Sequence, residues 1–196
     1  MTFESNSTSE EGAGALYIHS DAEVTVSNAT FTGNAATLDG GAIHISDATA
    51  TIETSAFTDN TADDDGGAIC LNNEASAELS WLTFESNVSG DNGGAVGVIS
   101  DGTITISDST FDANEAADYG GGLYVYKDSA ATVSDTTFTN NIAGEDGGGI
   151  LVRDSTVTGT TVTFAKNSPD DLYSYDGGES STLGAKADFD CDGDGC

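Results

Sequence analysis

The sequence predicts an all-β fold, a right-handed parallel β-helix (solenoid) of about seven 27-residue coils with three short strands in each coil. Three observations lead to this fold class. A Phe-x-x-Asn motif recurs seven times, at steps of 26 to 28 residues. A Gly-Gly motif keeps a constant phase with it, and stretches that alternate apolar and polar residues lie between the motifs. A fixed period of this length is typical of solenoids.

The Phe-x-x-Asn motif uses seven of the eight Phe residues. In a solenoid, equivalent residues of successive coils form columns at the ~4.8 Å spacing of neighbouring strands. We expect the Phe side chains to form an inner stack, and the Asn amides to bond to the backbone and to one another, because buried polar groups need partners. The predicted structural ladder consists of Phe31, Asn34, Phe57, Asn60, Phe84, Asn87, Phe111, Asn114, Phe138 and Asn141, with Phe3, Asn6, Phe164 and Asn167 at its ends.

The glycines and the alternating stretches supply the turns and the strands. In five coils a Gly pair begins six residues after the motif Asn, as Gly40-Gly41 does after Asn34. Such a pair suits a turn with positive φ or a close backbone approach. Alternation follows the pair, as in Ile43-His44-Ile45, and a second alternating stretch precedes the Phe, as in Val24-Thr25-Val26. Alternation indicates half-buried strands, and no segment carries a helical pattern.

Two regions are expected along the chain. Residues 1–169 carry the repeats and form the β-helix domain, and Pro169 follows the last motif and is expected to end the stack. Residues 170–196 are an acidic, Gly- and Asp-rich tail that we expect to be poorly ordered. The chain begins inside a coil, shows no signal peptide and has no obvious cap at either end, so we expect a fragment of a longer protein.

The composition limits the possible partners. The chain has 34 acidic residues against four Lys and Arg, a formal charge of −30. Such a surface repels nucleic acid, anionic membranes and acidic polysaccharides, and it attracts cations or suits a salty environment. No run approaches the ~20 apolar residues of a membrane helix, so no membrane span is expected in this chain. Cys191 and Cys196 could pair with each other or remain thiols, as Cys70 could.

The combination of Phe-x-x-Asn with Gly-Gly-Ala-(Ile/Val), as in Gly66-Gly-Ala-Ile69 and Gly93-Gly-Ala-Val96, resembles the repeat of the chlamydial polymorphic outer membrane proteins. The resemblance covers residues 3–167. It implies a right-handed parallel β-helix of the pectin lyase-like kind, displayed outside the cell and active in adhesion. An extracellular or cell-surface location follows from it as an expectation, with an unidentified protein or glycan as the partner.

One outward strand face is less polar than the rest and is the candidate binding face. Aromatic residues and Arg are typical anchors for a partner, whereas scattered exposed residues of this kind are also normal on a strand. His19 and His44 lie on adjacent coils and could share a metal ion. The candidate binding residues are Tyr17, His19, His44, Tyr124, Tyr126 and Arg153.

Ca²⁺ is the one cofactor that the acidic residues would suit, although none is required. The end of the chain matches the first half of a calcium loop, Asp-x-Asp-x-Asp-Gly, and an acidic tail without bound metal is the alternative. An acidic column before the Gly pairs is a second place for Ca²⁺, unless these are solvated turn residues. The tail ligands would be Asp188, Asp190, Asp192 and Asp194, and the column would be Asp39, Asp65, Asp91, Asp118 and Asp146.

Three function classes remain, one of which is a structural module that depends on bound cations. The favoured one is a non-catalytic secreted or cell-surface module, structural or adhesive, with no catalytic residues. The alternative is a carbohydrate-active enzyme, a polysaccharide lyase or hydrolase. A lyase acting on uronates needs a basic residue and basic substrate contacts, and only Lys127, Arg153, Lys166 and Lys186 are available. A hydrolase needs two positioned carboxylates, which 34 acids would supply by chance.

Overall fold

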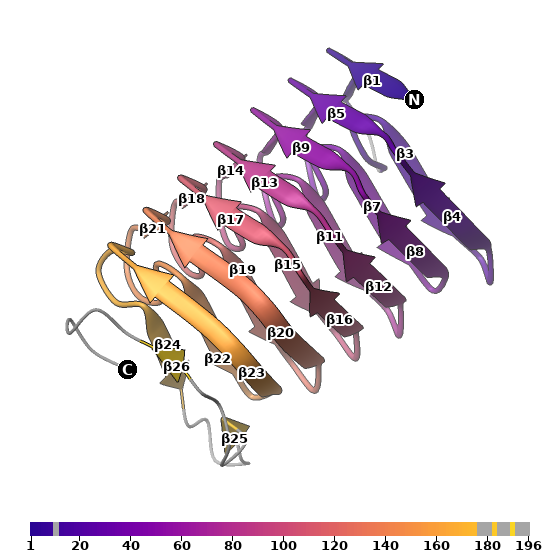
Figure 1. Cartoon of the computed structure of the whole chain (residues 1–196). Coiled ribbons are helices and arrows are strands. Elements are labelled where there is room, and N and C mark those ends of the chain that lie inside the picture. Colours follow the sequence, from indigo (N-terminus) through magenta and orange to yellow (C-terminus); the bar gives the residue numbers. More distant parts are fainter. Residues whose placement is uncertain (10–11, 176–181, 184–188, 191–196) are drawn as a thin grey trace.

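The computed structural model describes residues 1–9, 12–175, 182–183 and 189–190. Within these residues all regular structure is β-strand, and the chain winds from the N-terminal coil to the C-terminal end as a row of parallel turns (Figure 1). The prediction of a parallel β-helix with coils of about 27 residues and three strands in each is confirmed. The strands enclose about six complete turns.

Three parallel sheets form the walls of the helix. The first, here called the seven-stranded sheet, follows the Gly pairs and contains β3 (Leu16–His19), β7 (Ile43–Ser46), β11 (Ile69–Asn72), β15 (Val96–Ile99), β19 (Leu123–Tyr126), β22 (Ile150–Arg153) and β24 (Leu172–Tyr175). The short sheet after the motif Asn contains β2 (Ser7–Thr8), β6 (Ala35–Ala36), β10 (Thr61–Ala62), β14 (Val88–Ser89), β18 (Glu115–Ala116) and β21 (Ile142–Ala143).

The largest sheet holds both the alternating stretch before each Phe and the strand that carries the Phe. In the last two coils these two strands merge into one. The strands are β4 (Glu23–Ser27), β8 (Thr49–Glu53), β12 (Ser76–Ser80), β16 (Thr103–Ser107), β1 (Thr2–Glu4), β5 (Thr30–Thr32), β9 (Ala56–Thr58), β13 (Thr83–Glu85), β17 (Thr110–Asp112), β20 (Ala130–Thr139), β23 (Thr156–Ala165), β25 (Thr182–Leu183) and β26 (Phe189–Asp190).

The Phe side chains form the centre of the core. Each motif Phe is paired in register with the Phe of the next coil, as Phe3 is with Phe31. The seven rings stack with centroid separations of 4.5 to 5.4 Å and interplanar angles of at most 22°. Offset stacking of buried rings adds about 0.5–1.5 kcal/mol per pair to the burial of their apolar area. The stack therefore fixes the register of every coil.

The motif Asn side chains form a hydrogen-bonded ladder beside the Phe stack. Each Nδ2 donates to the Oδ1 of the next Asn at 2.8 to 2.9 Å, and from Asn34 onward it also donates to a Phe carbonyl of the preceding coil. The ladder ends at Asn167, whose Nδ2 donates to Asp171 Oδ1 at 2.8 Å. Asp171 is only 1% exposed, so a carboxylate takes the place that an eighth Asn would occupy.

The stack continues past the boundary expected at residue 169. β24 pairs in register with β22, so residues 172–175 belong to the seven-stranded sheet. Further on, the backbones of β25 and β26 pair with β23. The other residues of the expected tail lie outside the described part of the chain.

The Gly pairs precede β7, β11, β15, β19 and β22, and they allow the turn before each of these strands to fold back over the seven-stranded sheet. Gly40 has a φ of 67°, and a Cβ on it would lie 3.0 Å from His44 Cα. A Cβ on Gly41 would lie 2.0 Å from the carbonyl oxygen of Gly67 in the next coil. Only glycine permits both contacts, and the result is a turn that covers the outer side of the strand.

Candidate metal-binding site and tyrosine cluster

The turns bury a strand column that the sequence suggested would face outward. The register aligns Tyr17, His44, Cys70, Gly97, Tyr124 and Leu151 on one side of the seven-stranded sheet. Tyr17 is 41% exposed, but His44 is 8% and Tyr124 is 3% exposed. The expectation that His44 and Tyr124 are exposed binding residues is therefore corrected, because the turn before each Gly pair lies over their side chains.

The acidic column expected before the Gly pairs is not continuous. The backbone N–H of the first Gly in each pair donates to the residue before the next pair, and this register aligns Asp39, Asp65, Asn92, Tyr119 and Asp146. Asp91 and Asp118 lie one residue earlier and belong to a neighbouring column, in which Asp118 N donates to Asp91 O at 2.9 Å. The carboxylates are thus divided between two columns, and an amide follows Asp65 instead of a third carboxylate.

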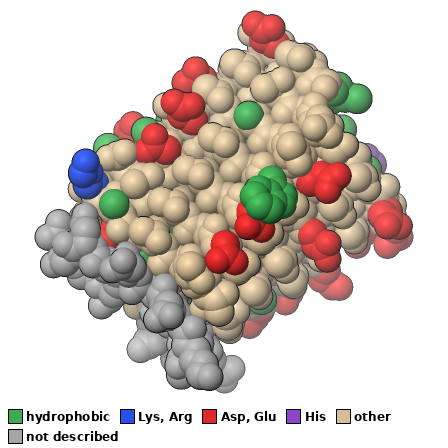
Figure 2. Space-filling model, in the orientation of Figure 1, with side chains coloured by type: hydrophobic (Ala, Val, Ile, Leu, Met, Phe, Trp, Pro, Cys, Tyr) green, Lys and Arg blue, Asp and Glu red, His purple; other side chains and the backbone are tan. Residues whose placement is uncertain are grey.

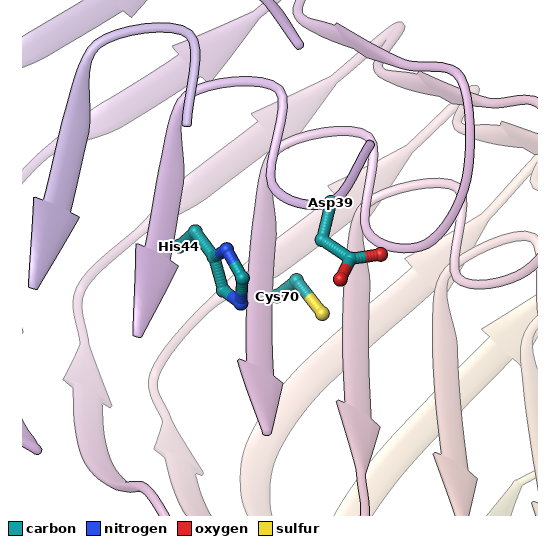
Figure 3. Close-up of side chains that lie close together, drawn as sticks. All are labelled: Asp39, His44 and Cys70. Carbon is teal, nitrogen blue, oxygen red and sulfur yellow. The ribbon is translucent and has the colours of Figure 1, made fainter. Parts of the chain in front are cut away.

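Asp39, His44 and Cys70 come together on the outer side of the seven-stranded sheet (Figure 3). His44 on β7 and Cys70 on β11 are directly paired residues of adjacent strands. Asp39 reaches them from the turn that Gly40 folds back. One potential ligand atom from each residue, an imidazole nitrogen, the sulfur and a carboxylate oxygen, lies within 4.8 Å of the other two.

The polar groups of this cluster are poorly compensated. Both ring nitrogens of His44 are buried and neither has a hydrogen-bond partner, while the ring packs against Tyr17 at a centroid distance of 5.0 Å. Asp39 Oδ1 accepts one bond, from the backbone N–H of Asp65 at 3.2 Å. Cys70 is fully buried. A buried polar group without a partner costs about 1–3 kcal/mol, so the free chain is destabilised here.

The ionisation of the cluster follows from burial. Burial lowers the pKa of His44. The charge of Asp39 opposes this shift, and the Asn72 side chain opposes it more weakly. Neither residue makes a hydrogen bond of normal geometry to the ring. Burial raises the pKa of Asp39. Burial also raises the pKa of the Cys70 thiol, and the charges of Asp39 and Asp65 raise it further. The free cluster therefore favours its neutral forms.

The sequence places His44 and Cys70 in one column but does not connect Asp39 with them. The shared column of His44 and Cys70 can be read from the repeat, since they occupy the same place in adjacent coils. The position of Asp39 could not be read in this way, because it depends on how the turn folds. The other expected pairing, of His19 with His44, is not part of the cluster.

A second feature of the same sheet is a tyrosine cluster near its C-terminal end. We define it as Tyr119, Tyr124, Tyr126, Tyr173, Tyr175 and Arg153. The Arg153 guanidinium lies over the ring of Tyr126 at 5.4 Å and over that of Tyr175 at 5.7 Å. Tyr175 packs on Tyr173 at 5.0 Å and edge-on against Tyr119 at 5.9 Å. All except Tyr124 are partly exposed.

The single binding face expected from the sequence is thus two separate groups. Tyr17 and His19 pack together at 4.6 Å on β3, at the N-terminal end of the sheet, whereas Tyr126 and Arg153 lie in the tyrosine cluster. Tyr173 and Tyr175 were missed because no motif follows Asn167. The alternation Leu172-Tyr-Ser-Tyr175 was the available signal, and it marks one more strand of the same sheet.

Most of the calcium loop expected at the C-terminus lies outside the described residues. Asp188, Asp192 and Asp194 lie outside the described residues, and of Asp190 only the backbone is described, in β26.

Comparison with known proteins agrees with the architecture. The family model of the right-handed β-helix region matches residues 1–138, and the chain belongs to this family. The repeat of the Chlamydia polymorphic membrane proteins matches residues 135–153, which suggests a surface or outer-membrane-associated protein. No curated protein and no solved structure matches the chain. Among the described residues there is no helix that could cross a membrane.

Proposed function

We propose that the protein is a non-catalytic secreted or cell-surface module, structural or adhesive, that binds a protein or glycan through the tyrosine cluster. The observation that carries this proposal is the concentration of five of the six Tyr residues and the only Arg near one end of one sheet, with four of these rings partly exposed. The match to a repeat of surface proteins supports the location. The proposed role requires no cofactor.

The cluster has the chemistry of a contact surface. Tyr and Arg are enriched among residues that contribute most to binding, and a Tyr ring buries a large area at a small cost in side-chain entropy. Arg153 is held between two rings and is only partly exposed. Tyr175 Oη donates to Asp146 Oδ2 at 2.7 Å, and Tyr119 Oη donates to Glu145. Rings bordered by carboxylates suit a neutral sugar, which stacks on the rings and donates hydroxyl protons, or a basic protein segment.

Acidic side chains are spread over the face shown in Figure 2 instead of gathering in one place. The formal charge of −30 disfavours nucleic acid and acidic polysaccharides as partners. The rigid stack of coils would hold the tyrosine cluster at a fixed end of an elongated module.

The test is attachment of the purified chain to host cells and to an array of neutral and acidic glycans. The double variant Tyr126→Ala with Arg153→Ala should weaken attachment about tenfold or more, since truncating central anchors typically costs at least 2 kcal/mol. Tyr17→Ala is the control, because it removes an exposed ring at the other end of the same sheet. Equal attachment of the double variant and the control would reject the tyrosine cluster as the binding surface.

The carbohydrate-active enzyme remains the second candidate, and one observation favours it. Burial raises the pKa of Asp65 to about 7, and the nearby charges of Asp39 and Asp91 add to the shift. A carboxyl group whose pKa is raised to near neutrality close to other carboxyl groups is typical of a general acid. Incubation with neutral polysaccharides should then release reducing ends in the parent chain and none in Asp65→Asn. No product from the parent chain would reject this candidate.

A further inference from the structure

We propose that Asp39, His44 and Cys70 form a binding site for a single divalent transition-metal ion of the Zn²⁺ class. A thiolate, an imidazole and a carboxylate are the three ligand types that Zn²⁺ takes in proteins. Ca²⁺ and Mg²⁺ take oxygen ligands and gain nothing from the sulfur or the ring. The proposal does not depend on the adhesive role, because the site lies on other coils than the tyrosine cluster.

The unpartnered His44 ring is the observation that points to a ligand. It is 8% exposed, and neither of its nitrogens has a hydrogen-bond partner. A buried imidazole in a fold normally donates or accepts at least one hydrogen bond. Metal coordination through one ring nitrogen would satisfy a group that the protein leaves unsatisfied.

The geometry requires only small side-chain movements. Bonds of about 2.0–2.3 Å to a tetrahedral ion place the ligand atoms roughly 3.3–3.8 Å apart, and they now lie within 4.8 Å of one another. Asp39 uses Oδ1 for the Asp65 N–H, so Oδ2 is available to the ion. The His44 ring has no hydrogen bond to break before it turns. On binding, the Cys70 thiol would release its proton to the buffer.

Three protein ligands leave a fourth position, as in zinc sites that keep an exchangeable ligand. A shallow pocket lined by Tyr17, Leu38, Asp39, His44 and Asn72 opens beside the cluster. Water or the Asn72 amide oxygen could reach the ion from this side. In the described coils the combination occurs once, because the column positions equivalent to His44 and Cys70 hold Tyr17, Gly97, Tyr124 and Leu151.

The test uses Co²⁺ as a spectroscopic probe of the full chain carrying Cys191→Ser and Cys196→Ser, so that Cys70 is the only thiol. One equivalent of Co²⁺ should produce a thiolate-to-metal charge-transfer band and intense visible bands of four-coordinate Co²⁺, and Zn²⁺ should remove both. Zn²⁺ should also raise the melting temperature, because a ligand stabilises the state that it binds, whereas equal Ca²⁺ should not. A rise with Ca²⁺ alone would overturn the proposal.

Three variants separate coordination from folding. Cys70→Ser should abolish the thiolate band, and His19→Ala, an exposed ring on the neighbouring strand, should leave it unchanged. Asp39→Asn keeps an oxygen for the Asp65 N–H and should preserve the fold while weakening Co²⁺ binding by at least about tenfold, since even indirect changes at metal sites cost 10- to 100-fold. A band that survives Cys70→Ser, no band in the folded parent, or undiminished affinity in Asp39→Asn would overturn the site as drawn.

Discussion

Replacing Asn114 by Ala removes one rung of the Asn ladder and should be among the most destabilising single changes in the chain. Asn114 Nδ2 donates to Phe84 O at 3.1 Å and to Asn141 Oδ1 at 2.9 Å. Its Oδ1 accepts from the backbone N–H of Asn87 at 3.0 Å and from Asn87 Nδ2 at 2.9 Å. All of these groups lie in the interior, where water cannot replace the lost partner.

The magnitude follows from this set of bonds. Four hydrogen bonds at a net ~1 kcal/mol each, together with ~1–3 kcal/mol for leaving the Asn87 N–H unsatisfied, give an expected loss of about 5–7 kcal/mol in the free energy of unfolding. Asn114→Asp should be at least as destabilising, because it loses both donors and buries a charge.

The assay is urea unfolding followed by circular dichroism of the β-signal and by tyrosine fluorescence. Glu115→Ala is the matched control, since Glu115 is the next residue, has an exposed side chain at the start of β18 and makes no side-chain bond to the Asn ladder. The control should change the free energy of unfolding by less than about 0.5 kcal/mol. A loss below about 1 kcal/mol in Asn114→Ala would refute the view that the ladder holds the coils together.

Three further changes test other parts of the stack. Phe111→Ala should lower the free energy of unfolding by about 3–5 kcal/mol, because the ring is fully buried between two stacked rings whose centroids lie 4.5 Å away. An unchanged free energy of unfolding would contradict a stabilising role of the stack. Gly94→Ala should unfold or severely destabilise the chain, because its Cβ would lie 2.2 Å from a carbonyl oxygen of the next coil. Gly97→Ala should be tolerated, because the nearest atom to its Cβ would be 3.3 Å away. Similar melting temperatures of the two variants would contradict the role of the turn. Burial raises the pKa of Asp65 from 3.8 to about 7, so the folded chain binds this proton more tightly than the unfolded chain and its stability falls as pH rises between these values. Asp65→Asn, which can still accept both bonds from Asn92, should therefore raise the melting temperature at about pH 8 and change it little at about pH 4; a pH-independent effect would show that the carboxyl is not the cause.

Several features of the protein were determined by the sequence alone. A constant period places equivalent residues in columns, so the Phe stack, the Asn ladder and the pairing of His44 with Cys70 all follow from counting residues. A shift of one residue would turn every inward side chain outward, which is why the strand register could be read without coordinates.

Only the tertiary structure decided what the turns cover. Gly40 and its equivalents fold each turn over the neighbouring strand, and this buries His44 and Tyr124 and brings Asp39 to the thiol of Cys70. The path of a turn depends on contacts with the coils on both sides, which no local pattern encodes. For the same reason the seventh strand at Leu172–Tyr175, where the motif is absent, became visible only through its pairing with β22.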